Sequence, residues 1–350
     1  MMIANRCETM GTPVRPAIPS CQSFPPIRNL TPPAPLRSSP NRHRAIAHMA
    51  FFFSTLAPSA LSAQDLARPM PDQDRRVAVI TGSTSGLGRA LALQLGQAGW
   101  HVVVHGRDVE RGEEVVAEIA RGRTGSAHFL RADLGSLAEV RQLADTILRH
   151  YNRVDLLINN AGIGSRVPAD RALSADGHEL RFAVNYLSHF LLTHLLLPRI
   201  RTSAPARIIN VSSIGQAPID FADVMIEQDF SGSRAYGQSK LAQIMFTIDL
   251  ASDLAGTNIQ VFALHPATYM DTNMVRASGI TPRSTVDEGA NAVRNLLTAS
   301  NLENGQFFNG LEPARANAQA YDAAARARLR ALSFELTGLD DSLRPEVIRR

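Results

Sequence analysis

The chain has 350 residues, 45% of them hydrophobic and 19% charged, and most of its formal net charge of +4 is carried by the first 74 residues. This composition is typical of a soluble globular protein with a sizeable core, and the nearly neutral remainder excludes the basic surface of a nucleic-acid-binding protein. Both cysteines, Cys7 and Cys21, fall in the early segment. The rest of the chain therefore has no disulfide framework, thiolate nucleophile or cysteine-based metal site, and we expect no metal.

The first 74 residues differ in character from the rest of the chain. Residues 1–44 are rich in proline, serine and arginine without apolar periodicity, which is typical of disorder. Residues 45–63 are apolar but are interrupted by polar residues and a proline, and a membrane-spanning helix needs about 20 strongly apolar residues. We predict that residues 1–74 form a disordered or targeting-like extension of a cytoplasmic protein. Export or membrane attachment through this segment is not favoured but stays open.

From residue 75 onward, short apolar segments alternate with helical patterns. The predicted strands are 75–82, 101–107, 126–134, 154–162, 206–213, 259–266 and 305–309. The predicted helices are 87–100, 107–122, 136–151, about 175–200, a run around Tyr236, and 286–297. This alternation indicates repeated βαβ units, and so an α/β fold with one doubly wound parallel sheet covered on both faces. We expect a single domain over residues 75–335, followed by a tail at 336–350.

A glycine-rich turn, T-G-S-T-S-G-L-G, joins the first predicted strand to the first predicted helix. Gly82, Gly86 and Gly88 would let the chain turn tightly and bring backbone N–H groups close to a pyrophosphate at the helix N-terminus. The turn therefore predicts a dinucleotide site, to which Ser85 and Leu87 belong as well. Its spacing differs from the G-x-G-x-x-G pattern.

The end of the second predicted strand indicates which dinucleotide binds. A site for NAD usually has Asp or Glu about 20 residues after the first glycine, where it binds the ribose 2′-hydroxyl. Gly106 and Arg107 stand there instead, and a guanidinium suits a 2′-phosphate. The sequence thus favours NADP(H) over NAD(H). We interpret Asp108 as the N-cap of the next helix.

The 36 basic residues include a single lysine, Lys240, four residues after Tyr236. Residues four apart share one face of a helix, so phenol and ammonium can reach the same point. A cation about 4 Å away would lower the pKa of a tyrosine by about three units, which would make Tyr236 a general acid/base. A compact ammonium can also hold two ribose hydroxyls, whereas a guanidinium is bulkier.

Two further polar residues are candidates for the same chemistry. Ser213 ends a predicted strand at the sheet edge where α/β sites form, and its hydroxyl could donate to a substrate carbonyl oxygen. Asn185 lies within a predicted helix, where asparagine is a poor helix former, and could hold a water molecule. The structural interpretations also stay open: Ser213 could simply end a strand, and Asn185 could have a purely structural role.

These residues fall in segments that resemble, in chain order, the motifs of the short-chain dehydrogenase/reductase family over about residues 75–335. The segments are TGSTSGLG, ADL, NNAG, VN, NVSS, YGQSK and HPATYMDT. The resemblance implies the strand order 3-2-1-4-5-6-7 and a catalytic tetrad of Asn185, Ser213, Tyr236 and Lys240, the last two also contacting the cofactor. It implies cofactor contacts at the following positions: Asp133, Leu134, Asn160, Ala161, Gly162, Pro266 and Thr272.

Two departures from the family pattern carry information. Ser213 and Tyr236 are 23 residues apart, about twice the usual spacing, and the extra residues together with the ending RLRALSFELTGL resemble the retinol-dehydrogenase-like and protochlorophyllide-reductase-like branch. Ala267 replaces the glycine of the family's Pro-Gly pair. The resemblance implies an NADP(H)-dependent oxidoreductase of carbonyls or alcohols, with a medium-sized apolar substrate, and a homodimer or homotetramer.

Other functions stay open at this point. A catalytically idle dinucleotide-binding module that acts through protein contacts would be indicated by a broken tetrad, and the tetrad is intact. An epimerase or dehydratase of the extended branch would carry T-G-x-x-G-x-x-G, which the chain lacks. The substrate and the direction of reaction are not specified by the sequence. We expect residues 214–235 and 269–282 to line the pocket.

Overall fold

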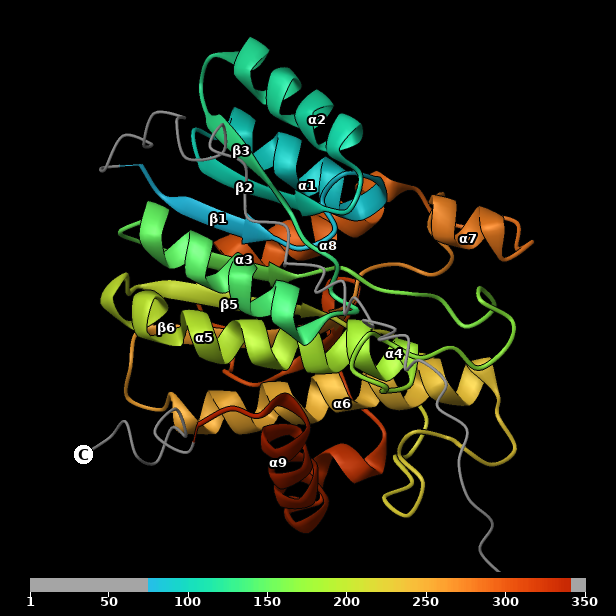
Figure 1. Ribbon diagram of the computed structural model, residues 1–350. Coiled ribbons are helices and arrows are strands. Elements are labelled where there is room, and N and C mark those ends of the chain that lie inside the picture. Colours follow the sequence, from blue (N-terminus) through green and yellow to red (C-terminus); the bar gives the residue numbers. More distant parts are fainter. Residues whose placement is uncertain (1–74, 341–350) are drawn as a thin grey trace, which may run out of the picture. The chain divides into compact units, whose positions relative to one another are not determined.

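A computed structural model describes residues 75–340 (Figure 1). The predicted extension at 1–74, with its apolar segment 45–63 and both cysteines, lies outside the described residues, as does 341–350. The strands are β1 (Val77–Ile80), β2 (His101–Gly106), β3 (Ser126–Arg131), β4 (Leu156–Asn159), β5 (Ala206–Val211), β6 (Ile259–His265), β7 (Phe307–Asn309) and β8 (Glu312–Ala314). The α-helices are α1 (Gly86–Gln97), α2 (Val109–Gly122), α3 (Leu137–His150), α4 (Leu180–Phe182), α5 (Ser188–Thr202), α6 (Gly232–Asp253), α7 (Asn273–Ala277), α8 (Val286–Thr298) and α9 (Ala323–Thr337). None of the helices between residues 75 and 340 combines the length and apolar character that crossing a bilayer requires.

The strands form one sheet in the order β3-β2-β1-β4-β5-β6-β7-β8. Neighbours from β3 to β7 run parallel; in β1, for example, Val79 pairs with Val103 of β2 and Leu157 of β4. The predicted fold class and the strand order 3-2-1-4-5-6-7 are therefore confirmed. The antiparallel strand β8 at the edge was not predicted, because its three residues, Glu-Pro-Ala, show no apolar pattern.

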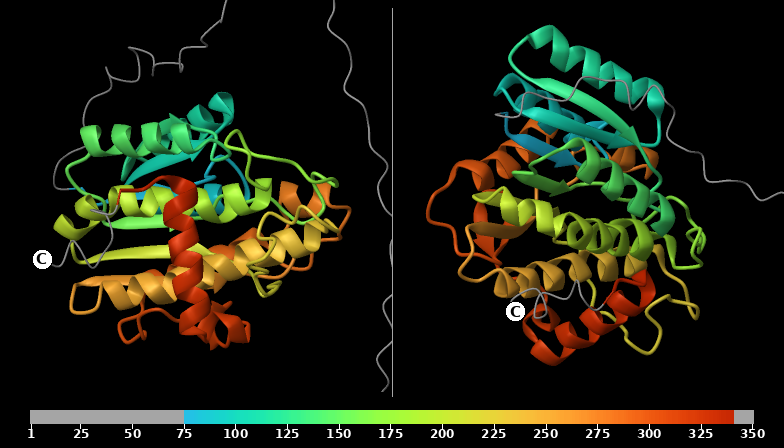
Figure 2. Two further views of the ribbon diagram at one scale, coloured as in Figure 1. Left: turned by 60° about the horizontal axis from the view of Figure 1, so that its bottom comes forward. Right: turned by 60° about the vertical axis from the view of Figure 1, so that its left-hand side comes forward.

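Helices cover both faces of the sheet (Figures 1 and 2). Alternate residues of β1 point in opposite directions: Val79 joins the core beneath α3, α5 and α6, whereas Ala78 and Ile80 join the core beneath α1, α2 and α8. All four residues of β1 are buried. A strand buried on both faces shows a continuous apolar run rather than alternation, and this is why the central strands could be located from the sequence.

The predicted long helix at about 175–200 begins later than expected and is not regular. Its first turn is α4, followed by one π-helical stretch, η1 (Ala183–Leu187), before α5 begins. The residues before it form a turn in which Leu173 bridges to Glu179. The Glu179 carboxylate accepts a hydrogen bond from the N–H of Phe182, 2.8 Å away, and so caps the helix. The π-helical stretch contains Asn185, and such stretches are frequent at functional sites.

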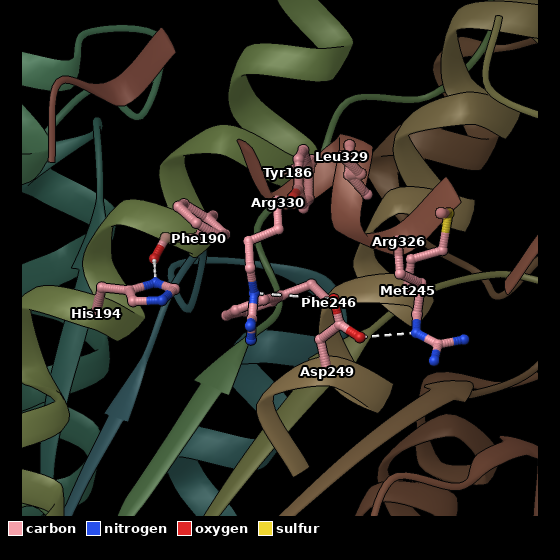
Figure 3. Close-up of a pocket in the computed structure, with 9 residues that line it drawn as sticks. All are labelled: Tyr186, Phe190, His194, Met245, Phe246, Asp249, Arg326, Leu329 and Arg330. Carbon is pink, nitrogen blue, oxygen red and sulfur yellow. Dashed lines mark hydrogen bonds and ion pairs between the residues drawn. The ribbon is translucent and has the colours of Figure 1, made fainter. Parts of the chain in front are cut away.

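The C-terminal helix α9 packs across α5 and α6 (Figure 2). The ring of Phe334 lies 5.4 Å, centroid to centroid, from that of Phe190. Arg326 Nε donates to Asp249 Oδ1 at 2.7 Å (Figure 3). The cavity between these helices measures about 10 Å³, room for no more than one water molecule. Helix α9 thus completes the core on this face.

Candidate active site

The predicted site residues meet at the carboxyl ends of the parallel strands. The glycine-rich turn follows β1, the segment Asn160–Gly162 follows β4, Ser213 follows β5, and Pro266 follows β6. In a doubly wound sheet these ends lie side by side at one edge. The fold therefore gathers residues that are up to 190 positions apart along the chain, from Gly82 to Thr272.

The glycine-rich turn is packed too tightly for side chains. Gly82 and Gly86 have φ values of +64° and +52°, in the left-handed region that favours glycine. A Cβ on Gly88 would lie 2.3 Å from the carbonyl oxygen of Gly82 and 2.5 Å from Asn160 Nδ2. The same Nδ2 donates hydrogen bonds to the carbonyl oxygens of Thr81 and Gly82, at 2.9 and 3.1 Å. The turn after β1 is thus held directly against the segment after β4.

Helix α1 begins in this turn with donors available to an anion. Ser85 is its N-cap residue, but its hydroxyl makes no capping hydrogen bond, and the first turn of α1 contains no acidic residue. Uncapped N–H groups and the positive end of the helix dipole together suit a phosphate group. Thr272 lies close by, with Cγ2 3.1 Å from where a Cβ of Gly86 would be, whereas Leu87 is buried in the core.

Arg107, which the sequence predicts to contact a 2′-phosphate, directly follows β2. Its side chain is 71% exposed, and Nη1 lies 3.7 Å from Asp133 Oδ2. Asp108 caps α2 by accepting from the N–H of Arg111 at 3.1 Å, which confirms the interpretation of this residue. The guanidinium is therefore close to Asp133 but remains open to solvent and to a ligand. Leu134, the neighbour of Asp133, is buried.

Ser213 and Tyr236 are brought together by β5 and α6. The Ser213 hydroxyl accepts a hydrogen bond from the N–H of Gly215 at 3.0 Å, and a Cβ on that glycine would lie 3.4 Å from Ser213 Oγ and 3.7 Å from the Tyr236 ring. Burial raises the pKa of Tyr236, and its hydrogen bond with Ser213 opposes the rise. The predicted lowering of this pKa by Lys240 is wrong for this structure. The ammonium lies 5.7 Å from the centre of the Tyr236 ring, and its hydrogen bonds go elsewhere.

Lys240 is buried, with 5% of its surface exposed. Its Nζ donates to the carbonyl oxygen of Val211 at 2.8 Å and to Gln243 Oε1 at 3.0 Å. The Ser212 hydroxyl, at the end of β5, donates to the main-chain oxygen of Lys240 at 2.7 Å. Burial lowers the lysine pKa to about 7. The charge on this side chain is therefore marginal at neutral pH and depends on the neutral acceptors around it.

Asn185 links the segment after β4 to α6. Its Oδ1 accepts from the N–H of Ile163 at 2.7 Å, and its Nδ2 donates to the carbonyl oxygen of Ile163 at 3.1 Å and to Ser239 Oγ at 2.9 Å. Protein atoms thus use both N–H donors of the side-chain amide and one of the two acceptor positions of its oxygen, and a water-holding role for this residue stays a prediction. The nearby N–H of Ala161 donates to Thr81 Oγ1 at 3.0 Å.

Three buried polar residues beside the tetrad were not predicted from the sequence: Thr81, His189 and Gln243. They form a chain of contacts from Lys240 through Gln243 and His189 to Thr81. Helical spacing carried a usable signal for two of them, because His189 is four residues after Asn185 and Gln243 is three after Lys240. Thr81 directly precedes the first glycine of the turn.

This sequence is similar to those of several known proteins. A family model described as short chain dehydrogenase matches residues 76–282. Human retinol dehydrogenase 13 is 36% identical to this chain, over 76% of this chain and 85% of that protein. Human retinol dehydrogenase 12 is 35% identical, over 75% of this chain and 87% of that protein.

Solved structures show the same fold. An uncharacterised protein from Mycobacterium paratuberculosis matches with a TM-score of 0.61 and 32% identity, over 77% of this chain and 96% of that chain. A metagenomic short-chain oxidoreductase in complex with NADP matches with a TM-score of 0.51 and 26% identity, over 69% of this chain and 97% of that chain.

We predict that Gly88→Ala disrupts the glycine-rich turn while Gly122→Ala does not. A methyl group on Gly88 would overlap backbone and the Asn160 amide, whereas one on Gly122 meets no atom within 4 Å. Displacing the turn should weaken dinucleotide binding by at least about tenfold, since small misplacements at such sites have large effects. Isothermal titration calorimetry with NADPH measures this, and equal affinities for the two variants would contradict the packing argument.

Proposed function

Because this chain belongs to the short-chain dehydrogenase family, we propose that it is an NADP(H)-dependent oxidoreductase that interconverts a carbonyl group and an alcohol on an apolar substrate. The observation that carries this proposal is the convergence of Ser213, Tyr236 and Lys240 at the sheet edge beside the glycine-rich turn. The oxidoreductase class itself follows from the family and from the similarity to retinol dehydrogenases.

The residues fit the two ends of a dinucleotide. The turn between β1 and α1 offers the free Ser85 hydroxyl and an uncapped helix N-terminus for the pyrophosphate, and Arg107 offers a solvent-accessible guanidinium for a 2′-phosphate. Asp133 and Leu134 would contact the adenine. Asn160, Ala161 and Gly162, with Pro266 and Thr272, would surround the rest of the cofactor. When bound, the cofactor supplies the hydride in reduction and accepts it in oxidation.

The protein's own groups would handle the proton. In the reducing direction the Tyr236 hydroxyl donates its proton to the substrate oxygen, while the Ser213 hydroxyl donates a hydrogen bond to the same oxygen and polarises the carbonyl. Lys240, when charged, would hold the ribose hydroxyls, and its charge 5.7 Å from the centre of the Tyr236 ring would favour the phenolate against the burial that raises the tyrosine pKa. Asn185 keeps the segment after β4 in register with α6, which carries both Tyr236 and Lys240.

The choice of NADP(H) over NAD(H) rests on Arg107 and is supported by the NADP in the metagenomic short-chain oxidoreductase. The choice of an apolar substrate is supported by three large apolar side chains that are 41–49% exposed on the segments after β5 and β6. These are Ile214, Tyr269 and Met274. Met274 also lies beside the segment after β4, with Sδ 3.4 Å from where a Cβ of Gly164 would be. Exposed apolar side chains on the segments that follow β5 and β6 would suit an apolar aldehyde, ketone or alcohol.

Self-association as a homodimer or homotetramer and residence in the cytoplasm stay predictions. Gel filtration with light scattering measures the first, and fractionation of cells that express the full chain measures the second.

We predict that the wild-type protein oxidises NADPH in the presence of at least one member of a panel of apolar aldehydes and ketones, followed by loss of absorbance. Tyr236→Phe removes the proton donor, so kcat should fall by at least about 100-fold while NADPH affinity stays nearly unchanged. Tyr321→Phe is the control, because this tyrosine is 44% exposed and its hydroxyl accepts from the N–H of Ala316. Full activity of Tyr236→Phe would contradict the proposed role.

We predict that Arg107→Asp moves cofactor preference from NADPH towards NADH. The substitution removes the cation that would meet the 2′-phosphate and adds repulsion of that group. Arg111→Asp is the matched control: Arg111 is an exposed arginine of α2 that pairs with Asp108 at 3.3 Å. Calorimetry with both cofactors decides the matter. Tighter binding of NADH than of NADPH by the wild-type protein would show that Arg107 does not select the cofactor.

A further inference from the structure

Behind Lys240, away from Tyr236, three buried polar side chains continue the hydrogen bonding of the ammonium into the protein. Gln243 Oε1 accepts from Lys240 Nζ at 3.0 Å, Gln243 Nε2 lies 3.3 Å from His189 Nδ1, and His189 Nε2 lies 3.1 Å from Thr81 Oγ1. Gln243, His189 and Thr81 are each at most 1% exposed. No bulk water reaches these groups, so each must be oriented by its neighbours.

The charge on Lys240 determines the direction of this chain. A protonated ammonium is only a donor, so it requires the carbonyl oxygen of the Gln243 amide rather than the NH₂ group. The NH₂ group then faces His189 Nδ1 and requires it to be an acceptor. A neutral histidine that accepts at Nδ1 carries its proton on Nε2, which then points at Thr81 Oγ1. This arrangement has a cost, because Thr81 Oγ1 already accepts from two backbone N–H groups and Nδ1 faces the main-chain oxygen of Asn185 without a proton.

The opposite direction lets His189 donate to Asn185 and accept from the Thr81 hydroxyl, and it is favoured when the lysine is uncharged. His189 Nδ1 also lies 3.0 Å from the main-chain oxygen of Asn185, to which it would donate if it carried the proton. Gln243 would then have to present its carbonyl oxygen to His189 and its NH₂ group to Lys240. An ammonium that faces that NH₂ group would place two hydrogen-bond donors against each other with no acceptor between them, which is unfavourable in a buried site.

We propose that Gln243 and His189 are positioning residues for Lys240, which hold its ammonium behind Tyr236 through one directional hydrogen-bond chain ending at Thr81. Thr81 Oγ1 also accepts from the N–H groups of Asn160 and Ala161, at 2.9 and 3.0 Å. The chain thus connects the lysine to the segment that holds the glycine-rich turn. As a role in catalysis, this inference rests on the proposed function; as a statement about the lysine charge, it does not.

The protonation state of Lys240 depends on these hydrogen bonds, because the titratable groups near it carry no compensating negative charge. The titratable groups facing it are Tyr236 on its own helix, His189 on α5 and His265 at the end of β6. Burial, with Lys240 as a second cause, lowers the pKa of His189 to about 3 and that of His265 to about 4, so both are neutral at pH 7. Burial lowers the pKa of Lys240 itself to about 7. Stabilisation of the ammonium therefore comes from neutral acceptors, of which the structure shows two, Val211 and Gln243.

The single lysine of the chain makes a direct test feasible. Protein labelled with ¹³C-lysine gives one Cε resonance, whose chemical shift against pH reports the pKa of Lys240 in the full chain without cofactor or substrate. Removing the acceptor in Gln243→Leu should lower this pKa by about one unit, since a hydrogen bond to the charged form stabilises it. Gln243→Glu places a carboxylate at the same point and should raise the pKa by at least about one unit. His189→Phe removes the group that orients the amide and should lower it by less than Gln243→Leu does.

Thr247→Val is the matched control. Thr247 is buried on α6 one turn beyond Gln243 and hydrogen-bonds with Asn210 Nδ2 and the main-chain oxygen of Gln243, so its loss disturbs the same helix without removing a partner of the ammonium. We expect its Lys240 pKa to match the wild type. If Gln243→Leu does not fold, the upward shift in Gln243→Glu still decides the proposal. A lysine pKa that is unchanged in Gln243→Glu overturns it, and an unchanged value in His189→Phe overturns the part assigned to His189.

Kinetics then separate this inference from the proposed function. In Gln243→Leu the high-pH limb of kcat for carbonyl reduction should move to lower pH by the same amount as the lysine pKa, with the KM of the carbonyl substrate unchanged. A shifted lysine pKa with an unshifted kcat profile overturns the catalytic role of the chain. If no carbonyl compound reacts at all, the proposed function fails, while the lysine titration still stands or falls by its own result.

Discussion

The Lys240 ammonium lies in the interior at the carboxyl edge of the sheet, and the polar structure around it compensates for its removal from water. An unsupported ammonium in such a place would lose its proton, because the low dielectric disfavours the charged form. The end of β5 contacts this residue twice, through the carbonyl oxygen of Val211 on the ammonium and the Ser212 hydroxyl on its main-chain oxygen. Gln243 supplies the second acceptor from the next turn of α6.

The rest of the site is held together by hydrogen bonds between the segments that follow β1, β4 and β5, which are neighbours in the sheet. Asn160 fastens the glycine-rich turn to the segment after β4, Asn185 fastens that segment to α6, and the β5 end fastens α6 to the sheet. Each link uses a side-chain amide or hydroxyl, which bonds a backbone group or, between Asn185 and Ser239, another side chain. A dinucleotide and a carbonyl group that enter this edge would therefore meet groups whose positions are already determined by the fold.

Some of the strands and caps could be predicted from the sequence, whereas other features could not, for physical reasons. Strands buried on both faces show as apolar runs, so β1 to β6 could be located, and the Asp108 cap could be recognised from its place before α2. The order of the strands came from family resemblance rather than from any local pattern. The helix containing Asn185 was predicted to begin too early, because the turn closed by Leu173 and Glu179 has no clear sequence signal.

Contacts between helices and the effect of burial were beyond what the sequence could show. Gln243 and His189 lie on different helices, and their meeting depends on how α5 and α6 pack. The direction of the Tyr236 pKa was predicted wrongly because only charge spacing can be read from sequence, whereas burial of the phenol has the larger effect. The predicted positions of Ser213, Tyr236 and Lys240 at one edge agree with the structure, while their catalytic roles await measurement.

We infer that the position of Lys240 requires a compact ammonium, in a chain that has arginine at each of its 35 other lysine or arginine positions (36 in all, less Lys240). The most direct measurement compares NADPH-dependent carbonyl reduction by the wild-type protein and by Lys240→Arg at the same pH. A guanidinium keeps the positive charge but cannot fit between Val211, Gln243 and Tyr236 in the same geometry, so kcat should fall by at least about 100-fold. A folded Lys240→Arg protein that turns over at close to the wild-type rate would contradict the claim.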